Sequence, residues 1–174
     1  MATLRALLFL GLAAGLAGGC APDPGPAAVG ERFPPLRLAA LDSAGRVQEA
    51  LPRGRNVVLN VWATWCEPCR REMAGLERLA REHGELDVVG VSIDADANLA
   101  REFLLAQDVR FPNYIDPGGR AVHDALGVQA LPQTFVITRD GTVVARIAGA
   151  RDWSGRETRS MLRDVLALSS GASP

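Results

Sequence analysis

The polar and apolar positions of the chain follow two periods, one typical of strands and one of helices. Residues 57–62 are almost continuously apolar and β-branched, as expected for a central strand buried on both faces. The following apolar residues recur at helical spacing between charged ones, which predicts an amphipathic helix at 67–83. A second buried strand is expected at 86–93 and a second helix at 96–107. The apolar side chains expected to face inward in that helix are Leu99, Phe103 and Leu104.

The second half of the chain continues the alternation. A short helix is expected at 121–126, followed by two β-rich runs at 133–138 and 142–148. An Asp-Gly pair between these runs favours an antiparallel hairpin. A final amphipathic helix at 155–168 should cover the sheet, and a weaker β region precedes all of this at 36–48. The order predicts an α/β fold with a mixed sheet and helices on its faces.

The N-terminus has the pattern of a signal peptide over residues 1–19. A basic residue, Arg5, precedes an uncharged apolar stretch, and two glycines stand directly before Cys20. The apolar stretch is shorter than the roughly twenty residues that a membrane-spanning helix needs, so an uncleaved anchor is the less favoured alternative. The end of the segment resembles a bacterial lipobox, which implies a lipidated Cys20. Ala17 stands where that pattern prefers Leu, so release after simple cleavage is the alternative.

The rest of the chain is expected to form one domain. Residues 20–32 combine the lipid-anchor cysteine with a tether rich in Pro, Gly and Ala. The domain is expected at 33–169, with a flexible tail at 170–174. Of the 174 residues, 48% are hydrophobic and 22% charged, as in ordinary globular proteins. A net charge of -1 and the lack of a basic patch argue against a nucleic-acid partner.

The three cysteines indicate redox chemistry. Cys66 and Cys69 are too close for their bridge to constrain the unfolded chain strongly, and no set of about four zinc ligands accompanies them, so we expect no metal site. Cys66 falls where the strand turns into the helix, where unpaired backbone N–H groups favour a thiolate. We therefore expect Cys66 to be the nucleophile and Cys69 the resolving thiol. Pro68 suits the first helical turn.

Two segments resemble the TlpA/ResA group of thioredoxin-like proteins. Residues 62–69, Trp-Ala-Thr-Trp-Cys-Glu-Pro-Cys, are similar to the active site of that group, and residues 131–137 are similar to its second motif. The resemblance implies a thioredoxin-like fold with an extra N-terminal β region and a βα insertion. It also implies that Pro132 is a cis-proline against the cysteines, and that the backbone of Leu131 pairs with an extended substrate segment. The alternative is a proline with a structural role only.

The same resemblance assigns roles around the cysteines. Asn60 occupies the place where thioredoxin carries a buried Asp for proton transfer, so the carboxylate must come from elsewhere. Glu72, one turn after Cys69, is the candidate; the alternative is a solvated helix glutamate. Glu67 is expected to be exposed and to adjust potential and partner choice, and Trp65 to shield the thiolate and contact partners. Trp153 is expected to be a packing residue.

The function expected from these residues is extracytoplasmic thiol-disulfide exchange. The chain would reduce disulfides of exported proteins at the periplasmic face, in cytochrome c maturation or copper-site assembly. It would draw electrons from a membrane thiol-disulfide donor and act as a monomer, with no cofactor besides the Cys66–Cys69 pair. The alternatives are a dithiol module for copper binding or redox sensing, and a peroxiredoxin-like antioxidant enzyme. The direction of electron flow stays open, because sequence does not quantify thiolate stabilisation.

Overall fold

The computed structural model describes residues 27–170 except 43, 53, 83 and 85. The expected signal peptide, Cys20 and the first part of the tether lie outside these residues. In order, the elements are β1 (Arg37–Ala40), β2 (Val47–Glu49), β3 (Asn56–Trp62), α1 (Glu67–Glu82), β4 (Leu86–Ser92), α2 (Ala97–Ala106), β5 (Asn113–Ile115), α3 (Arg120–Leu126), β6 (Gln133–Ile137), β7 (Val143–Ala148) and α4 (Arg156–Ser170). No helix among the described residues has the length and apolarity to cross a bilayer.

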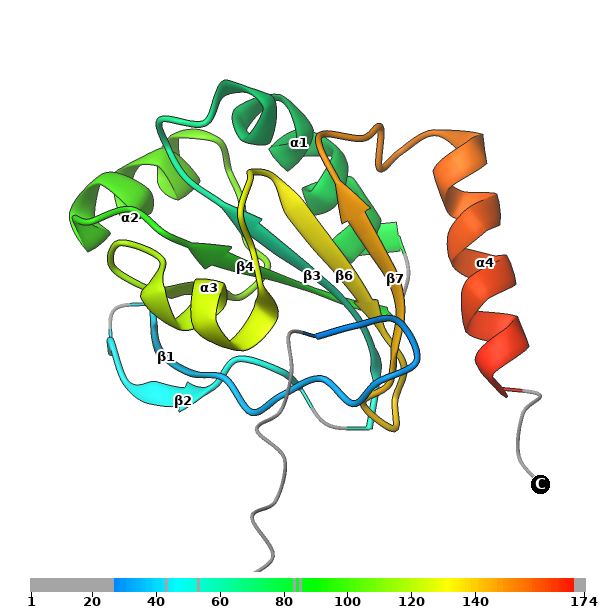
Figure 1. Cartoon of the computed structure of the whole chain (residues 1–174). Helices are drawn as coiled ribbons and strands as arrows, with labels where there is room; N and C mark the ends of the chain where they lie inside the picture. Colours follow the sequence, from blue (N-terminus) through cyan, green and yellow to red (C-terminus); the bar gives the residue numbers. More distant parts are fainter. Residues whose placement is uncertain (1–26, 43, 53, 83, 85, 171–174) are drawn as a thin grey trace, which may run out of the picture.

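The seven strands form one mixed sheet in the order β2-β1-β5-β4-β3-β6-β7 (Figure 1). The apolar strand β3 lies inside it, parallel to β4 and antiparallel to β6. β6 and β7 form the expected antiparallel hairpin, and β1 and β2 the expected N-terminal β region. The alternation of strands and helices in the sequence is therefore confirmed as a helix-covered sheet.

The side chains of β3 alternate between two cores because successive residues of a strand point to opposite faces. Val57, Leu59 and Val61 pack with α3 and the N-terminal segment on one face. Val58 and Trp62 pack on the other face, where α1, α2 and α4 contribute to the core. Asn60 shares the register of Val58 and Trp62, so the same alternation places its polar side chain beneath α1.

The orientation of α2 differs from the sequence prediction at one residue. Phe103 and Leu104 pack inward as expected, and the Phe103 ring lies 5.4 Å from that of Trp62. Leu99 is instead 54% exposed. Ala100 and Leu104, four residues apart, form the buried stripe of the helix, and Leu99 lies about 100° away from that stripe. The prediction for Leu99 was wrong because several helical faces fit so short a pattern.

The chain joins the fold before the expected boundary at Phe33. Ala27 is buried in the core. The backbone N–H of Gly30 donates to the Val143 carbonyl at 2.8 Å, and the N–H of Val143 donates to the Glu31 carbonyl at 2.9 Å. Residues 27–32 thus satisfy backbone groups at the start of β7, an edge strand whose free side needs cover. The Pro-rich and Gly-rich composition of this segment predicted a tether, because residue types alone do not show that its backbone pairs with β7.

Candidate active site

The two cysteines are joined at the point where the chain leaves β3 and enters α1. Cys66 and Cys69 form a disulfide with their Cα atoms 5.3 Å apart. Cys66 is 6% exposed and Cys69 is fully buried, so Cys66 is the cysteine that a partner can reach. The backbone N–H of Cys69 donates to Cys66 Sγ at 3.3 Å. In the reduced protein, this N–H and the positive end of the α1 dipole favour a thiolate at Cys66.

A buried carboxylate fixes the loop before Cys66. Asp94 follows β4, and β4 is parallel to β3, so both strands end at the same edge of the sheet. Its carboxylate accepts hydrogen bonds from the Thr64 N–H at 3.0 Å, from Thr64 Oγ1 at 2.6 Å and from Ser92 Oγ at 2.7 Å. Sequence reasoning missed Asp94. Its position directly after a buried strand was the available signal.

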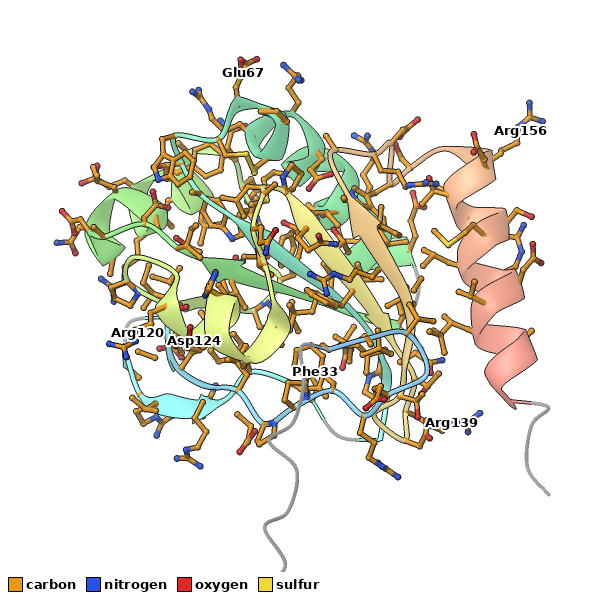
Figure 2. All side chains as sticks on the ribbon, in the orientation of Figure 1. Phe33, Glu67, Arg120, Asp124, Arg139 and Arg156 are labelled. Atoms are coloured by element: carbon orange, nitrogen blue, oxygen red, sulfur yellow. A yellow bond between two sulfur atoms is a disulfide. The ribbon has the colours of Figure 1, made fainter. Side chains whose placement is uncertain are left out.

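A groove of about 640 Å³ opens beside the disulfide. It brings together the residues that the sequence predicted for substrate contact: Trp65, Glu67, Pro68 and Leu131. Trp65 stands 68% exposed. Glu67 is also exposed as expected, points outward from the start of α1 (Figure 2), and pairs with Arg71 at 2.7 Å. The groove offers an apolar surface around the accessible sulfur.

Pro132 forms the expected cis peptide bond with Leu131. It is buried and directly precedes β6, whose first residue Gln133 pairs with Val61 of β3. The Pro132 carbonyl accepts a hydrogen bond from the Gly149 N–H at 2.9 Å. The neighbouring Leu131 lines the groove together with Cys66. The second sequence motif therefore meets the first at the groove.

Glu72 is buried beneath α1 rather than solvated. Only 4% of the residue is exposed. Its carboxylate accepts hydrogen bonds from Asn60 Nδ2 at 2.8 Å, from the Arg151 N–H at 3.0 Å and from Trp153 Nε1 at 2.9 Å. Burial raises the pKa of Glu72 above its ordinary value, while these hydrogen bonds act in the opposite direction. The alternative of a solvated helix glutamate is excluded.

Comparison with known families agrees with this geometry. The profile of the Redoxin family matches residues 28–166. The chain belongs to the Redoxin family. It is 34% identical over 116 residues to thiol-disulfide oxidoreductase ResA of Bacillus thuringiensis subsp. konkukian, covering 66% of this chain and 63% of that protein. It is 34% identical to thioredoxin-like protein YneN of Bacillus subtilis, covering 66% of this chain and 68% of that protein. The chain thus spans less than two thirds of that ResA.

Solved structures show that this Redoxin member has a thioredoxin-like fold. A DsbF homologue from Corynebacterium diphtheriae superposes with a TM-score of 0.67 at 28% identity, covering 79% of this chain and 88% of that one. A secreted thiol-disulfide isomerase from Corynebacterium glutamicum has the same TM-score at 22% identity, covering 79% of this chain and 85% of the other. The fold expected from the sequence resemblance is confirmed.

Trp153 does more than the packing role expected for it. It is fully buried, and its indole N–H reaches Glu72 from the loop between β7 and α4. Gly75 on α1 makes this approach possible, since a Cβ there would lie 3.3 Å from Trp153 Cβ. A glycine inside a helix costs roughly 1 kcal/mol relative to alanine. Gly75, one turn after Glu72, was therefore the signal in the sequence that another segment packs closely against this part of α1.

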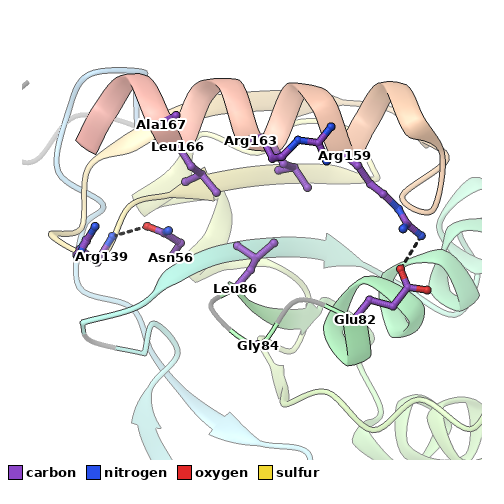
Figure 3. Close-up of a pocket in the computed structure, with 10 residues that line it drawn as sticks. Asn56, Glu82, Gly84, Leu86, Arg139, Arg159, Arg163, Leu166 and Ala167 are labelled. Carbon is purple, nitrogen blue, oxygen red and sulfur yellow. Dashed lines mark hydrogen bonds and ion pairs between the residues drawn. The ribbon is translucent and has the colours of Figure 1, made fainter. Parts of the chain in front are cut away.

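A second hollow, of about 390 Å³, lies between α4 and the start of β3 and β4 (Figure 3). Three arginines, Arg139, Arg159 and Arg163, line it, and Arg159 pairs with Glu82 at 2.5 Å. It sits at the opposite end of β3 from Cys66 and is not part of the redox site. Across the described part of the chain, no three His, Cys, Asp or Glu side chains are grouped closely enough to hold a metal ion.

Proposed function

We propose that this chain is an extracytoplasmic thiol-disulfide oxidoreductase that reduces disulfides of exported proteins through Cys66 and Cys69. The observation that carries the proposal is the disulfide at the start of α1, in which Cys66 is the more accessible cysteine and lines the apolar groove. The names of the ResA relatives as thiol-disulfide oxidoreductases support it. So does the cis peptide bond between Leu131 and Pro132, because Leu131 lines the same groove as Cys66.

The exchange runs in two displacements from the reduced protein. The Cys66 thiolate attacks one sulfur of a substrate disulfide, which forms a mixed disulfide and releases the other substrate sulfur as a thiolate. The Cys69 thiolate then attacks Cys66 Sγ. This breaks the mixed disulfide, forms the Cys66–Cys69 bond and frees the second substrate thiol. The substrate gains two electrons and the protein loses two, which a thiol-disulfide donor must restore.

Glu72 serves the second displacement as a proton acceptor. Cys69 is buried, and a buried thiol ionises only if a nearby base takes its proton. Glu72 lies one turn along the same helix, and its raised pKa brings its proton affinity closer to that of a thiol than an exposed glutamate's. When the donor restores the dithiol, the proton returns from Glu72 to Cys69.

The export part of the proposal rests on the signal-peptide pattern and on the secreted relative from Corynebacterium glutamicum. Cys20 carries the lipid anchor that holds the monomer at the periplasmic face. Its electron donor is a membrane thiol-disulfide protein, and apocytochrome c or copper-site cysteines are its substrates. Mass spectrometry of the mature N-terminus tests the anchor. A diacylated Cys20 supports it, and an N-terminal residue that carries no lipid contradicts it.

The reduction potential of the Cys66–Cys69 couple tests the redox proposal. Equilibration with glutathione or dithiothreitol buffers should give a reduction potential of about -270 mV, typical of a reductase. A reduction potential of about -120 mV points to disulfide donation instead. Absence of a reversible couple contradicts the enzymatic function itself.

A trapping experiment tests the order of attack. Cys69→Ser leaves the nucleophile without its resolving thiol, so a mixed disulfide between Cys66 and a substrate should accumulate. Cys66→Ser is the matched control, because the fully buried Cys69 should trap nothing. Equal trapping by both variants contradicts the assignment of Cys66 as nucleophile.

A further inference from the structure

The two carboxylate oxygens of Glu72 have unequal surroundings. Oε2 accepts two hydrogen bonds, from the Arg151 N–H at 3.0 Å and from Trp153 Nε1 at 2.9 Å. Oε1 accepts one, from Asn60 Nδ2 at 2.8 Å. A carboxylate oxygen has two lone pairs in its plane. Among the described contacts, Oε2 is therefore fully occupied and Oε1 keeps a lone pair for a proton.

We propose that Trp153 is a positioning residue of the redox site, which together with the Arg151 N–H occupies Oε2 and leaves Oε1 to exchange the Cys69 proton. This inference rests on the proposed function, because it assigns the atom of Glu72 that serves the second displacement. Trp153 acts through its hydrogen bond to Glu72 rather than on the reacting sulfurs.

Asn60 gives the protonated state of Oε1 a partner. Its Nδ2 donates to Glu72 Oε1 and to Thr134 Oγ1, at 2.8 and 2.9 Å. Its Oδ1 is buried and has no hydrogen-bond partner among the described residues. When the proton binds the second lone pair of Oε1, Asn60 Nδ2 still donates to the first. Asn60 can therefore keep its hydrogen bond to Glu72 in both protonation states.

The loop that carries Trp153 is fastened to α1 next to Glu72. Gly75 admits Trp153 at close range, and Arg78 Nη2 donates to Ser154 Oγ at 2.8 Å. Ser154 is held in turn by Asp152, which accepts from its N–H and hydroxyl. Among the described residues, the donors to the carboxylate are an amide, an indole and a backbone N–H, and Cys69 lies one turn before it on α1. Cys69 is the one of these that exchanges protons.

Trp153→Phe removes the indole donor and keeps an aromatic ring in the core. The acid dissociation constant of Glu72 is read by carboxyl ¹³C NMR titration of the oxidised full chain, with Glu72→Gln identifying the signal. We expect the constant to fall roughly ten-fold, because the charged form loses a donor. Ser154→Ala is the matched control: it loosens the same loop but removes no donor to Glu72, and should leave the constant unchanged. An unchanged constant in Trp153→Phe overturns the proposal.

Gly75→Ala is a second variant that decides the matter if Trp153→Phe does not fold. Its Cβ would lie 3.3 Å from Trp153 Cβ and move Trp153 by a few tenths of an ångström, which lengthens the hydrogen bond to Oε2. The dissociation constant should therefore fall in the same direction, but less than in Trp153→Phe. A constant that stays the same, with the Trp153 indole N–H signal shifted, contradicts the proposal.

The pH profile of the disulfide-exchange rate separates positioning from packing. Trp153→Phe should move the midpoint of the profile to higher pH by an amount that matches the fall in the Glu72 dissociation constant. In the Glu72→Gln background, Trp153→Phe should not move the midpoint. A displacement that persists in the Glu72→Gln background assigns Trp153 a structural role only. If the wild-type protein has no reversible dithiol couple, the proposed function fails instead. The NMR titration would still measure how the indole affects the Glu72 carboxylate, so the two failures can be told apart.

Discussion

Glu72 is kept in the interior by hydrogen bonds from neutral groups. The described residues give it no cationic partner: its donors are Asn60, Trp153 and the backbone of Arg151. Neutral donors compensate only part of the lost hydration, so burial raises the pKa of the carboxyl from its ordinary value of 4.5. The protonated form is therefore favoured more strongly in the folded chain than in the unfolded chain.

This difference predicts how the stability of the oxidised protein depends on pH. The stabilising contribution of protonated Glu72 to the free energy of unfolding is fully present below the pKa of the unfolded chain, and it is lost as the pH rises through the higher pKa of the folded chain. The Glu72→Gln variant cannot ionise at this position. Its free energy of unfolding should therefore increase relative to wild type as the pH rises between these two pKa values. Urea unfolding from about pH 4 to about pH 8 measures the difference. A difference that does not change with pH would show that Glu72 titrates normally.

At the scale of elements, the fit between β4 and its neighbours depends on the absence of a side chain at Gly90. Asn113 Oδ1 accepts from Trp62 Nε1 at 2.9 Å directly over this residue. A Cβ at Gly90 would lie 1.8 Å from that oxygen and 3.0 Å from the indole nitrogen. A side chain at this position would therefore push Asn113 away from its hydrogen bond with Trp62.

Gly90→Ala should lower the free energy of unfolding by about 2–3 kcal/mol, because the Asn113 side chain must leave its site. Gly84→Ala is the control, since a Cβ there meets nothing within 4 Å and the backbone needs no positive φ. Chemical denaturation of both variants measures the contrast. Equal midpoints for the two would contradict the close approach over β4.

The apolar face of α4 gives a second test at this scale. Leu162 is buried in the core beneath α4, whereas Leu105 on α2 is 81% exposed. Leu162→Ala should lower the free energy of unfolding by about 2–4 kcal/mol through the cavity that it leaves. Leu105→Ala should change it by less than roughly 0.5 kcal/mol. A mild effect of Leu162→Ala would mean that α4 does not contribute to the core.

At the scale of the whole molecule, the N-terminal segment closes the side of the sheet where β7 has no further strand. Residues 27–32 pair with the start of β7, and Phe33 packs edge-on against Phe135 at 5.9 Å between ring centroids. The segment thereby ties the first described residues to the hairpin that follows the cis-proline. It belongs to the domain, although its composition is typical of a linker.

A chain that begins at Phe33 should be less stable than one that begins at Ala27. It loses two backbone hydrogen bonds to Val143 and the burial of Ala27, which together amount to roughly 1–3 kcal/mol. Thermal and urea unfolding of the two chains, both oxidised, measures the difference. If the two unfold at the same midpoint, residues 27–32 are a tether after all.

The cis-proline was implied by the resemblance of residues 131–137 to a known motif. Local pattern in the sequence determined the strand-helix order and the position of Cys66 and Cys69 at the start of α1. These features depend on periodicities of two and 3.6 residues and on short spacings, which neighbouring residues encode directly. The sequence is compatible with both a buried and a solvated Glu72, and the fold decides for the buried state. Its donors lie up to 81 residues away along the chain.

Tertiary structure alone decided the rest: the indole on Glu72, the Asp94 contacts to the loop before Cys66, the pairing of residues 27–32 and the exposure of Leu99. Each depends on which distant segments the sheet order brings together, and no local pattern contains that information. Hydrogen bonds to a buried carboxylate are selected by this assembly, because a polar group removed from water must find its partners wherever the fold places them.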